Sequence, residues 1–137
     1  MKNRIRVATA LAVTSLVTLA FSGTASAAAL GTASCSTTGA SGSVGVDWGI
    51  DPYDEVKLAM SVRDTLADGH HVRIRFLSKP VGSSQTFYWA WHSLTAGSGE
   101  TLTFSTTAQS SYGIDEAGVQ VARFEGDALL NSCTAWD

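Results

Sequence analysis

The chain has 137 residues, with nine Lys and Arg against twelve Asp and Glu and a formal net charge of −3 at pH 7. This excess of acidic residues argues against nucleic acid and anionic membrane surfaces as partners, because both favour basic patches. The length fits one small domain preceded by a short targeting segment.

The N-terminus has the pattern of a secretory signal peptide. Three basic residues are followed by an apolar stretch over 7–21 and then by small residues that end at Ala27. We therefore predict a signal peptide over 1–27, cleaved after Ala27, and a secreted, extracellular protein. The apolar stretch is shorter than the roughly 20 residues that a membrane-spanning helix needs, and no second one follows, so we expect no membrane span.

A lipoprotein anchor at Cys35 is an alternative for this end of the chain, because Thr32 to Cys35 faintly resembles a lipobox. Cys35, however, lies 14 residues beyond Phe21, the last residue of the apolar stretch. Position 32 is also Thr, where a large aliphatic residue is usual.

The sequence holds only two cysteines, Cys35 and Cys133. An even pair in a small secreted domain predicts one disulfide. A zinc site or a catalytic thiol would need further Cys or His residues at ligand spacing, which the sequence lacks.

The rest of the chain is patterned as strands. Residues 28–43 are small and polar, which predicts a flexible lead-in. Beyond them apolar residues alternate with polar ones, which is typical of strands with one buried face. The alternating segments are 44–48, 56–62, 72–76, 87–91, 101–105 and 119–121. We therefore expect an all-β fold over 44–137, a small antiparallel two-sheet sandwich of immunoglobulin-like type with about seven strands. A small barrel is the alternative.

One hairpin suggests a ligand-binding surface. Symmetrical pairing of 71–77 with 86–92 sets Val72 opposite Trp91, Ile74 opposite Trp89 and Phe76 opposite Phe87, all on the core face. The opposite face then carries His71, Arg73, Arg75, Tyr88 and His92. Arg beside Tyr can bind a carboxylate or a sugar face, so we take this patch as a candidate site. The alternative is that the Arg side chains simply cover the sheet.

Other chemistry is not indicated. The three histidines do not supply a third ligand on one face, and we expect no metal and no cofactor. The acidic residues Asp47, Asp51, Asp54 and Glu55 offer oxygen ligands for Ca²⁺, but a turn at Asp51-Pro52 explains them more simply. No G-x-S-x-G, H-E-x-x-H or Gly-rich phosphate loop is present, so we expect no enzymatic activity.

Several features of the chain together resemble a known group of proteins. They are the signal peptide, the two cysteines and the blocks VRDTLADGHHVRIRF and GVQVARFEGDALLNSC. The chain resembles small secreted proteins of actinobacteria, a group with no assigned activity. The resemblance implies a secreted β-domain and supplies no site residues. We expect an extracellular binding module whose partner is a polysaccharide, a cell-envelope component or a secreted protein. Alternatives are an inhibitor that acts through the loop Ser78 to Gln85 and a small hydrolase.

Overall fold

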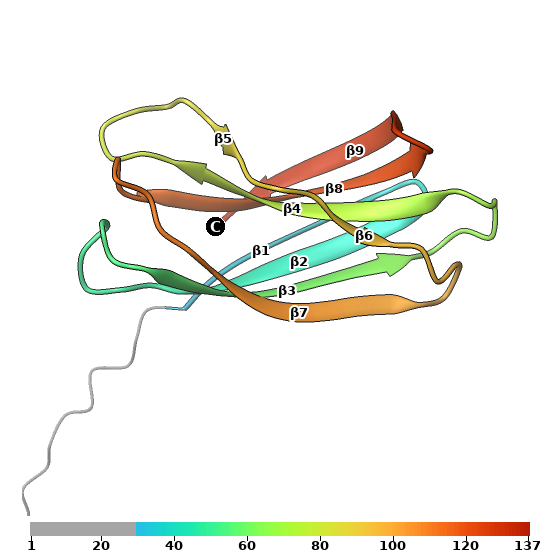
Figure 1. The fold of residues 1–137 in the computed structure, drawn as a ribbon, viewed down its shortest axis with the longest axis horizontal. Coiled ribbons are helices and arrows are strands. Elements are labelled where there is room, and N and C mark those ends of the chain that lie inside the picture. Colours follow the sequence, from blue (N-terminus) through green and yellow to red (C-terminus); the bar gives the residue numbers. More distant parts are fainter. Residues whose placement is uncertain (1–29) are drawn as a thin grey trace, which may run out of the picture.

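The computed structural model describes residues 30–137, which form two antiparallel sheets (Figure 1). The first sheet has the order β1-β2-β3-β7 and the second the order β5-β4-β8-β9, with β6 also paired to β4. The strands are β1 (Leu30–Thr37), β2 (Ala40–Asp47), β3 (Val56–Asp64), β4 (His71–Lys79), β5 (Phe87–Tyr88), β6 (His92–Leu94), β7 (Thr101–Ala108), β8 (Glu116–Glu125) and β9 (Ala128–Trp136). The predicted signal peptide over 1–27 lies outside the described residues. No helix long and apolar enough to cross a membrane is found within 30–137.

The all-β prediction is confirmed, with differences in detail. The described part of the chain has nine strands rather than about seven. The immunoglobulin-like strand order is not confirmed, because β1, β2 and β3 follow one another in the same sheet. In the immunoglobulin constant-type sandwich the third strand belongs to the second sheet.

The predicted flexible lead-in is wrong over the residues that the structure describes. Residues 30–43 form β1 and the first half of β2, so the ordered domain begins at 30 and not at 44. The small side chains are needed here, because the sheets approach closely. A Cβ added to Gly42 would lie 2.7 Å from Val121 Cγ2 of the opposite sheet. Buried Ala33 and Ala40 belong to the same thin part of the core.

The core lies between the two sheets and is mostly aliphatic. Inward-facing side chains alternate along β3 and β4, as the period-two pattern predicts. The larger buried members include Val44, Val46, Leu58, Met60 and Val62 from the first sheet, and Val72, Ile74, Phe76, Val119 and Val121 from the second. Each such side chain contributes about 1.5–3 kcal/mol by leaving water.

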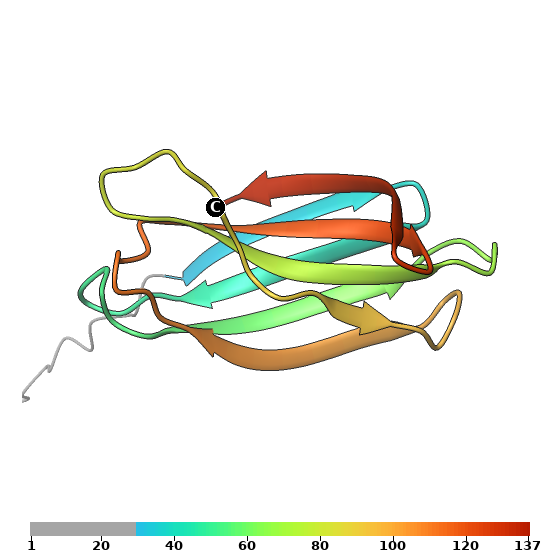
Figure 2. The same ribbon diagram turned by 45° about the horizontal axis from the view of Figure 1, so that its top comes forward.

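The predicted disulfide is confirmed. Cys35 of β1 is bonded to Cys133 of β9, with 6.0 Å between the two Cα atoms. The bond joins an edge strand of one sheet to an edge strand of the other (Figure 2). Cys35 is therefore not free to carry a lipid, which removes the lipoprotein alternative.

The predicted hairpin partner of β4 is broken into two short strands. Tyr88 of β5 lies opposite Leu77, two residues from the expected register, so Tyr88 keeps its predicted outer face. Phe87, which was predicted in the core, lies opposite Ser78 near the end of β4, where it is 40% exposed and does not belong to the core cluster. His92 of β6 lies opposite Ile74 instead of His71, a shift of three residues that reverses the faces. One extra residue between β5 and β6 accounts for the difference between the two registers.

Candidate functional site

The predicted patch on the hairpin is assembled in part. His71, Arg73 and Arg75 alternate along β4 with the buried Val72 and Ile74, which places them on the outer face of the second sheet. Tyr88 joins them there, because its ring lies under the Arg75 guanidinium. The structure does not bring His92 to this face.

His92 lies instead at the open edge between the sheets, because it pairs with the inward-facing Ile74. Its ring centroid is 4.3 Å from that of Phe104 on β7. Trp91 takes the place expected for His92 on the outer face, where it contacts Arg75 and Phe124. The prediction that Trp91 is a core residue is therefore wrong, whereas Trp89 does pack on the core.

At the end of the patch that holds His71 and Arg73, the basic side chains lie over the sheet. The guanidinium of Arg73 lies 4.2 Å from the centroid of the Phe124 ring, and His71 stacks on the same ring. Arg73 also donates a 2.9 Å hydrogen bond to Asp127, and this bond lowers the pKa of the Asp127 carboxyl. With Phe124 only 4% exposed, this part of the patch acts as a small outer hydrophobic cluster.

A second concentration of surface groups lies where three loops meet. The loops are the β2–β3 loop (48–55), the β4–β5 loop (80–86) and the β7–β8 loop (109–115), and both ribbon views place them at the same end of the sheets (Figures 1 and 2). Backbone bonds tie them together: Val81 N–H donates to Tyr112 O at 3.2 Å, and Ile114 N–H donates to Pro52 O at 2.7 Å. The three loops therefore form one connected surface.

Gly113 lies at the point where the loops converge. Its φ is +73°, which favours glycine. A Cβ at this position would lie 2.7 Å from Val81 Cγ2 and 3.3 Å from Tyr53 Cε1. Because Gly113 has no side chain, Val81 and Tyr53 from the other two loops can pack closely against the β7–β8 loop.

The exposed aromatic side chains gather at this end. Within residues 30–137 the exposed aromatics are Tyr53 (51%), Phe87 (40%), Tyr88 (59%) and Tyr112 (66%). All four line two adjoining hollows. Phe87 and Tyr112 line both, with nearly parallel rings whose centroids are 6.1 Å apart. We call Tyr53, Val81, Phe87, Tyr88 and Tyr112 the loop-end surface.

The remaining groups of the two hollows are neutral. Hydroxyl and amide side chains lie among the rings, and no charged side chain contributes to either lining. The polar members are Ser78, Ser83, Gln85, Gln109, Ser110 and Ser111. Such groups donate and accept hydrogen bonds without the desolvation cost of a charge. The loop-end surface is therefore suited to a ligand with flat apolar faces and many hydroxyl groups.

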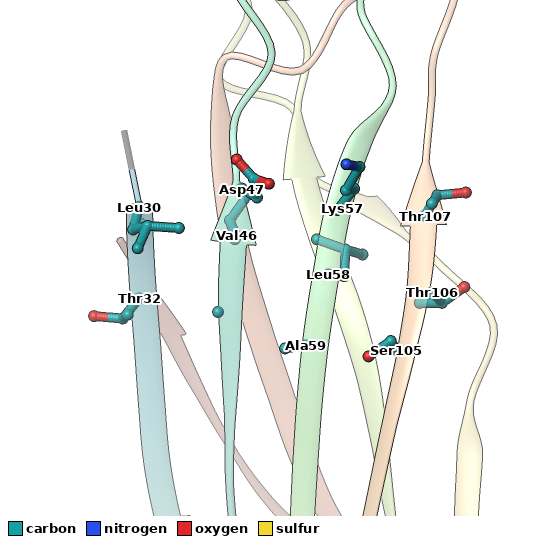
Figure 3. A pocket seen from close by; sticks show the side chains of 12 residues that line it. Leu30, Thr32, Val46, Asp47, Lys57, Leu58, Ala59, Ser105, Thr106 and Thr107 are labelled. Carbon is teal, nitrogen blue, oxygen red and sulfur yellow. The ribbon is translucent and has the colours of Figure 1, made fainter. Parts of the chain in front are cut away.

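A third hollow, of about 510 Å³, lies on the first sheet (Figure 3). It forms because a row of small residues, Thr32, Gly45, Ala59 and Ser105, crosses the outer face beside the longer side chains of Leu30 and Lys57. No aromatic ring lines it.

The acidic residues near the β2–β3 loop stabilise that loop's own backbone. Asp51 Oδ1 accepts a hydrogen bond from the backbone N–H of Tyr53, and Asp54 Oδ2 accepts from those of Ile50 and Asp51. The turn therefore accounts for both carboxylates. No group of three or more His, Cys, Asp or Glu that could hold a metal ion occurs among the described residues.

The sequence did not point to the loop-end surface. The symmetrical hairpin predicts Phe87 in the core, and Tyr53 and Tyr112 lie outside the strands, where no alternation marks a residue. Their signal was an aromatic residue directly beside Pro52 or Gly113 in otherwise polar turns. A scan against models of known protein families finds no match for this chain, and a search of curated proteins finds none either.

Proposed function

We propose that the protein is a secreted, non-catalytic binding module that holds a polysaccharide on its loop-end surface. One observation carries the proposal: every exposed aromatic side chain of residues 30–137 lines one of two adjoining, uncharged hollows. Exposed aromatic rings are costly in water, and their gathering at one place marks an interaction site.

The chemistry of the hollows fits a sugar chain. The apolar faces of sugar rings stack on aromatic side chains, and sugar hydroxyls exchange hydrogen bonds with Ser and Gln. Because the Phe87–Tyr112 pair separates the two hollows, a chain of two or more sugars can contact both at once. The bonds between the loops hold the rings in place before binding, which lowers the entropy cost.

The compartment is part of the same proposal. The predicted signal peptide and the Cys35–Cys133 disulfide both favour a protein that works outside the reducing cytoplasm. Polysaccharides and other envelope materials are the abundant ligands there.

A second candidate function is inhibition of another protein through the β4–β5 loop. The loop is stiffened by a bond from Ser83 N–H to Pro80 O and one from Gln85 N–H to Ser83 Oγ, both 3.1 Å. Val81, within the loop, is 41% exposed. A preformed, exposed loop is what such an inhibitor presents to its target. An inhibitory β4–β5 loop would not explain the exposed rings of Tyr53 and Tyr112 on the other two loops, whereas polysaccharide binding does.

Co-sedimentation tests the proposed function. Purified protein with its disulfide intact is mixed with insoluble cell-wall material and with several insoluble polysaccharides, and the bound fraction is measured. We expect selective binding that falls at least about tenfold in the Phe87→Ala, Tyr112→Ala variant, because truncating two central aromatics together costs more than about 1.4 kcal/mol.

The matched control is the Leu129→Ala, Leu130→Ala variant. Both leucines are exposed hydrophobic residues, and they follow the β8–β9 turn at the opposite end of the sheets (Figure 1). This variant should bind like the wild type. Equal binding by all three proteins would place the ligand elsewhere, and no binding to any material would contradict the polysaccharide proposal and favour a protein partner.

A further inference from the structure

We propose that Arg75 gives the loop-end surface a preference for acidic polysaccharides, by binding the carboxylate of a uronic acid beside the aromatic hollows. This inference rests on the proposed function and names its ligand class. It starts from Arg75, the one arginine or lysine on the outer face of the second sheet that forms no ion pair within residues 30–137.

Arg75 is held rigidly between two rings. The centre of its guanidinium lies 4.3 Å from the centroid of the Tyr88 ring and 4.2 Å from that of the Trp91 ring. Its Nε donates a 2.7 Å hydrogen bond to Gln120 Oε1 on the neighbouring strand. Two rings and one bond therefore set the position of the group before any ligand arrives.

The neighbouring cations differ from Arg75 in having carboxylate partners. Arg73 is paired with Asp127 at 2.9 Å, and Lys79 is paired with Glu116 at 2.5 Å. Among residues 30–137 no such ion pair is found for Arg75. Its partner across the strands is Gln120, an amide that accepts the hydrogen bond and leaves the positive charge uncompensated.

The uncompensated charge is partly withdrawn from water. Burial lowers the pKa of the Arg75 guanidinium, although the group stays protonated at neutral pH. A partly desolvated cation without a counter-charge is costly, and an anion from outside relieves that cost.

The free side of the guanidinium is open to a ligand. Only Nε has a hydrogen-bond acceptor among the described residues, so Nη1 and Nη2 keep their donors. No buried side-chain nitrogen or oxygen within 30–137 lacks a partner, which means that these two nitrogens reach solvent. Two adjacent N–H groups match the two oxygens of a carboxylate.

Tyr88 connects this cation to the loop-end surface. It is 59% exposed, stacks on Arg75 and also lines the hollow that contains Phe87 and Tyr112. A sugar chain that lies against the rings thus passes next to the guanidinium. An acidic peptide would use the same cation, but it would leave the aromatic rings and the Ser and Gln side chains of the hollow without a role.

The test compares acidic polysaccharides with their own neutral forms. Polygalacturonate, alginate and hyaluronan are each used as they are and after chemical reduction of the carboxylates to alcohols, with poly-glutamate as the peptide probe. The proteins are the wild type, Arg75→Gln and Arg63→Gln. Arg63 is an exposed arginine of β3, in the other sheet, so its variant removes the same charge away from the site.

We expect the wild type to bind at least one native acidic polymer tenfold or more tightly than its reduced form. Arg75→Gln should abolish that difference while retaining the weaker binding, and Arg63→Gln should behave as the wild type. Equal binding of native and reduced polymers by the wild type, or the same preference in Arg75→Gln, overturns the role of Arg75 and leaves the proposed function standing. Binding of poly-glutamate alone overturns both, as does binding of none of these polymers together with none of the materials in the co-sedimentation test.

Discussion

Removal of the Cys35–Cys133 disulfide should cost this domain much of its stability. The two cysteines are 98 residues apart in the sequence, so the bond closes almost the whole described chain into one loop. The chain-entropy model gives about 4.7 kcal/mol for a loop of this length. A domain of this size has a free energy of unfolding of about 5–15 kcal/mol, so the loss is a large share.

The structure adds a reason to expect the full effect. β1 and the first half of β2 carry small inward residues such as Ala33 and Gly42, which bury little apolar surface to hold the edge strand in place. Unfolding in urea, followed by tryptophan fluorescence, should show the midpoint of Cys35→Ser, Cys133→Ser lowered by roughly 2–4 M relative to the oxidised wild type. The reduced wild type is the control and should match the variant. A midpoint lowered by less than about 0.5 M would refute the reasoning.

Three further predictions follow from single contacts. Gly113→Ala should weaken polysaccharide binding and lower the free energy of unfolding by about 1–3 kcal/mol, because a Cβ would press on Val81 Cγ2 at 2.7 Å in a backbone with positive φ; wild-type binding and stability would contradict this. Ile74→Ala, which empties a fully buried site, should cost about 2–5 kcal/mol in urea unfolding, and a loss below about 1 kcal/mol would show that the core is not packed as described. The pKa of the Asp127 carboxyl should lie below that of an ordinary aspartate in an NMR pH titration, because Arg73 donates a hydrogen bond to it. The stabilising effect of this pair is therefore complete above the ordinary aspartate pKa and is lost as the pH falls through the lower folded value. Arg73→Gln should raise the pKa toward the ordinary value, and an unchanged titration would contradict the pairing.

The sequence predicted those strands whose inward side chains are large and missed those whose inward side chains are small. Strands β3 and β4 were evident because large aliphatic residues alternate with polar ones. The sequence of β1 instead predicts a flexible lead-in, because its inward positions hold Ala33 and other small residues, which give no alternation of large apolar and polar residues. The need for small residues arises from the close approach of β2 to β8 at Gly42, a contact between segments about 80 residues apart that no local pattern contains.

The candidate site could likewise be predicted only where it depends on a local pattern. Alternation along β4 correctly grouped Arg73 and Arg75 on one face, and Tyr88 joined them although the register differed by two residues. The prediction failed for His92 because one extra residue before β6 reversed the faces. The loop-end surface was missed for another reason: its rings come from three loops whose contacts exist only in the folded chain.

The most direct test of the central claim is to locate the bound sugar on the protein. Oligosaccharides prepared from a polysaccharide that co-sediments are titrated into isotope-labelled protein, and backbone amide shifts are followed by NMR. The proposed function predicts that the largest shifts fall in the three loops, at 50–54, 80–88 and 109–114. Largest shifts around Gly45 and Ala59, the hollow of Figure 3, would contradict it and assign the binding to the outer face of the first sheet.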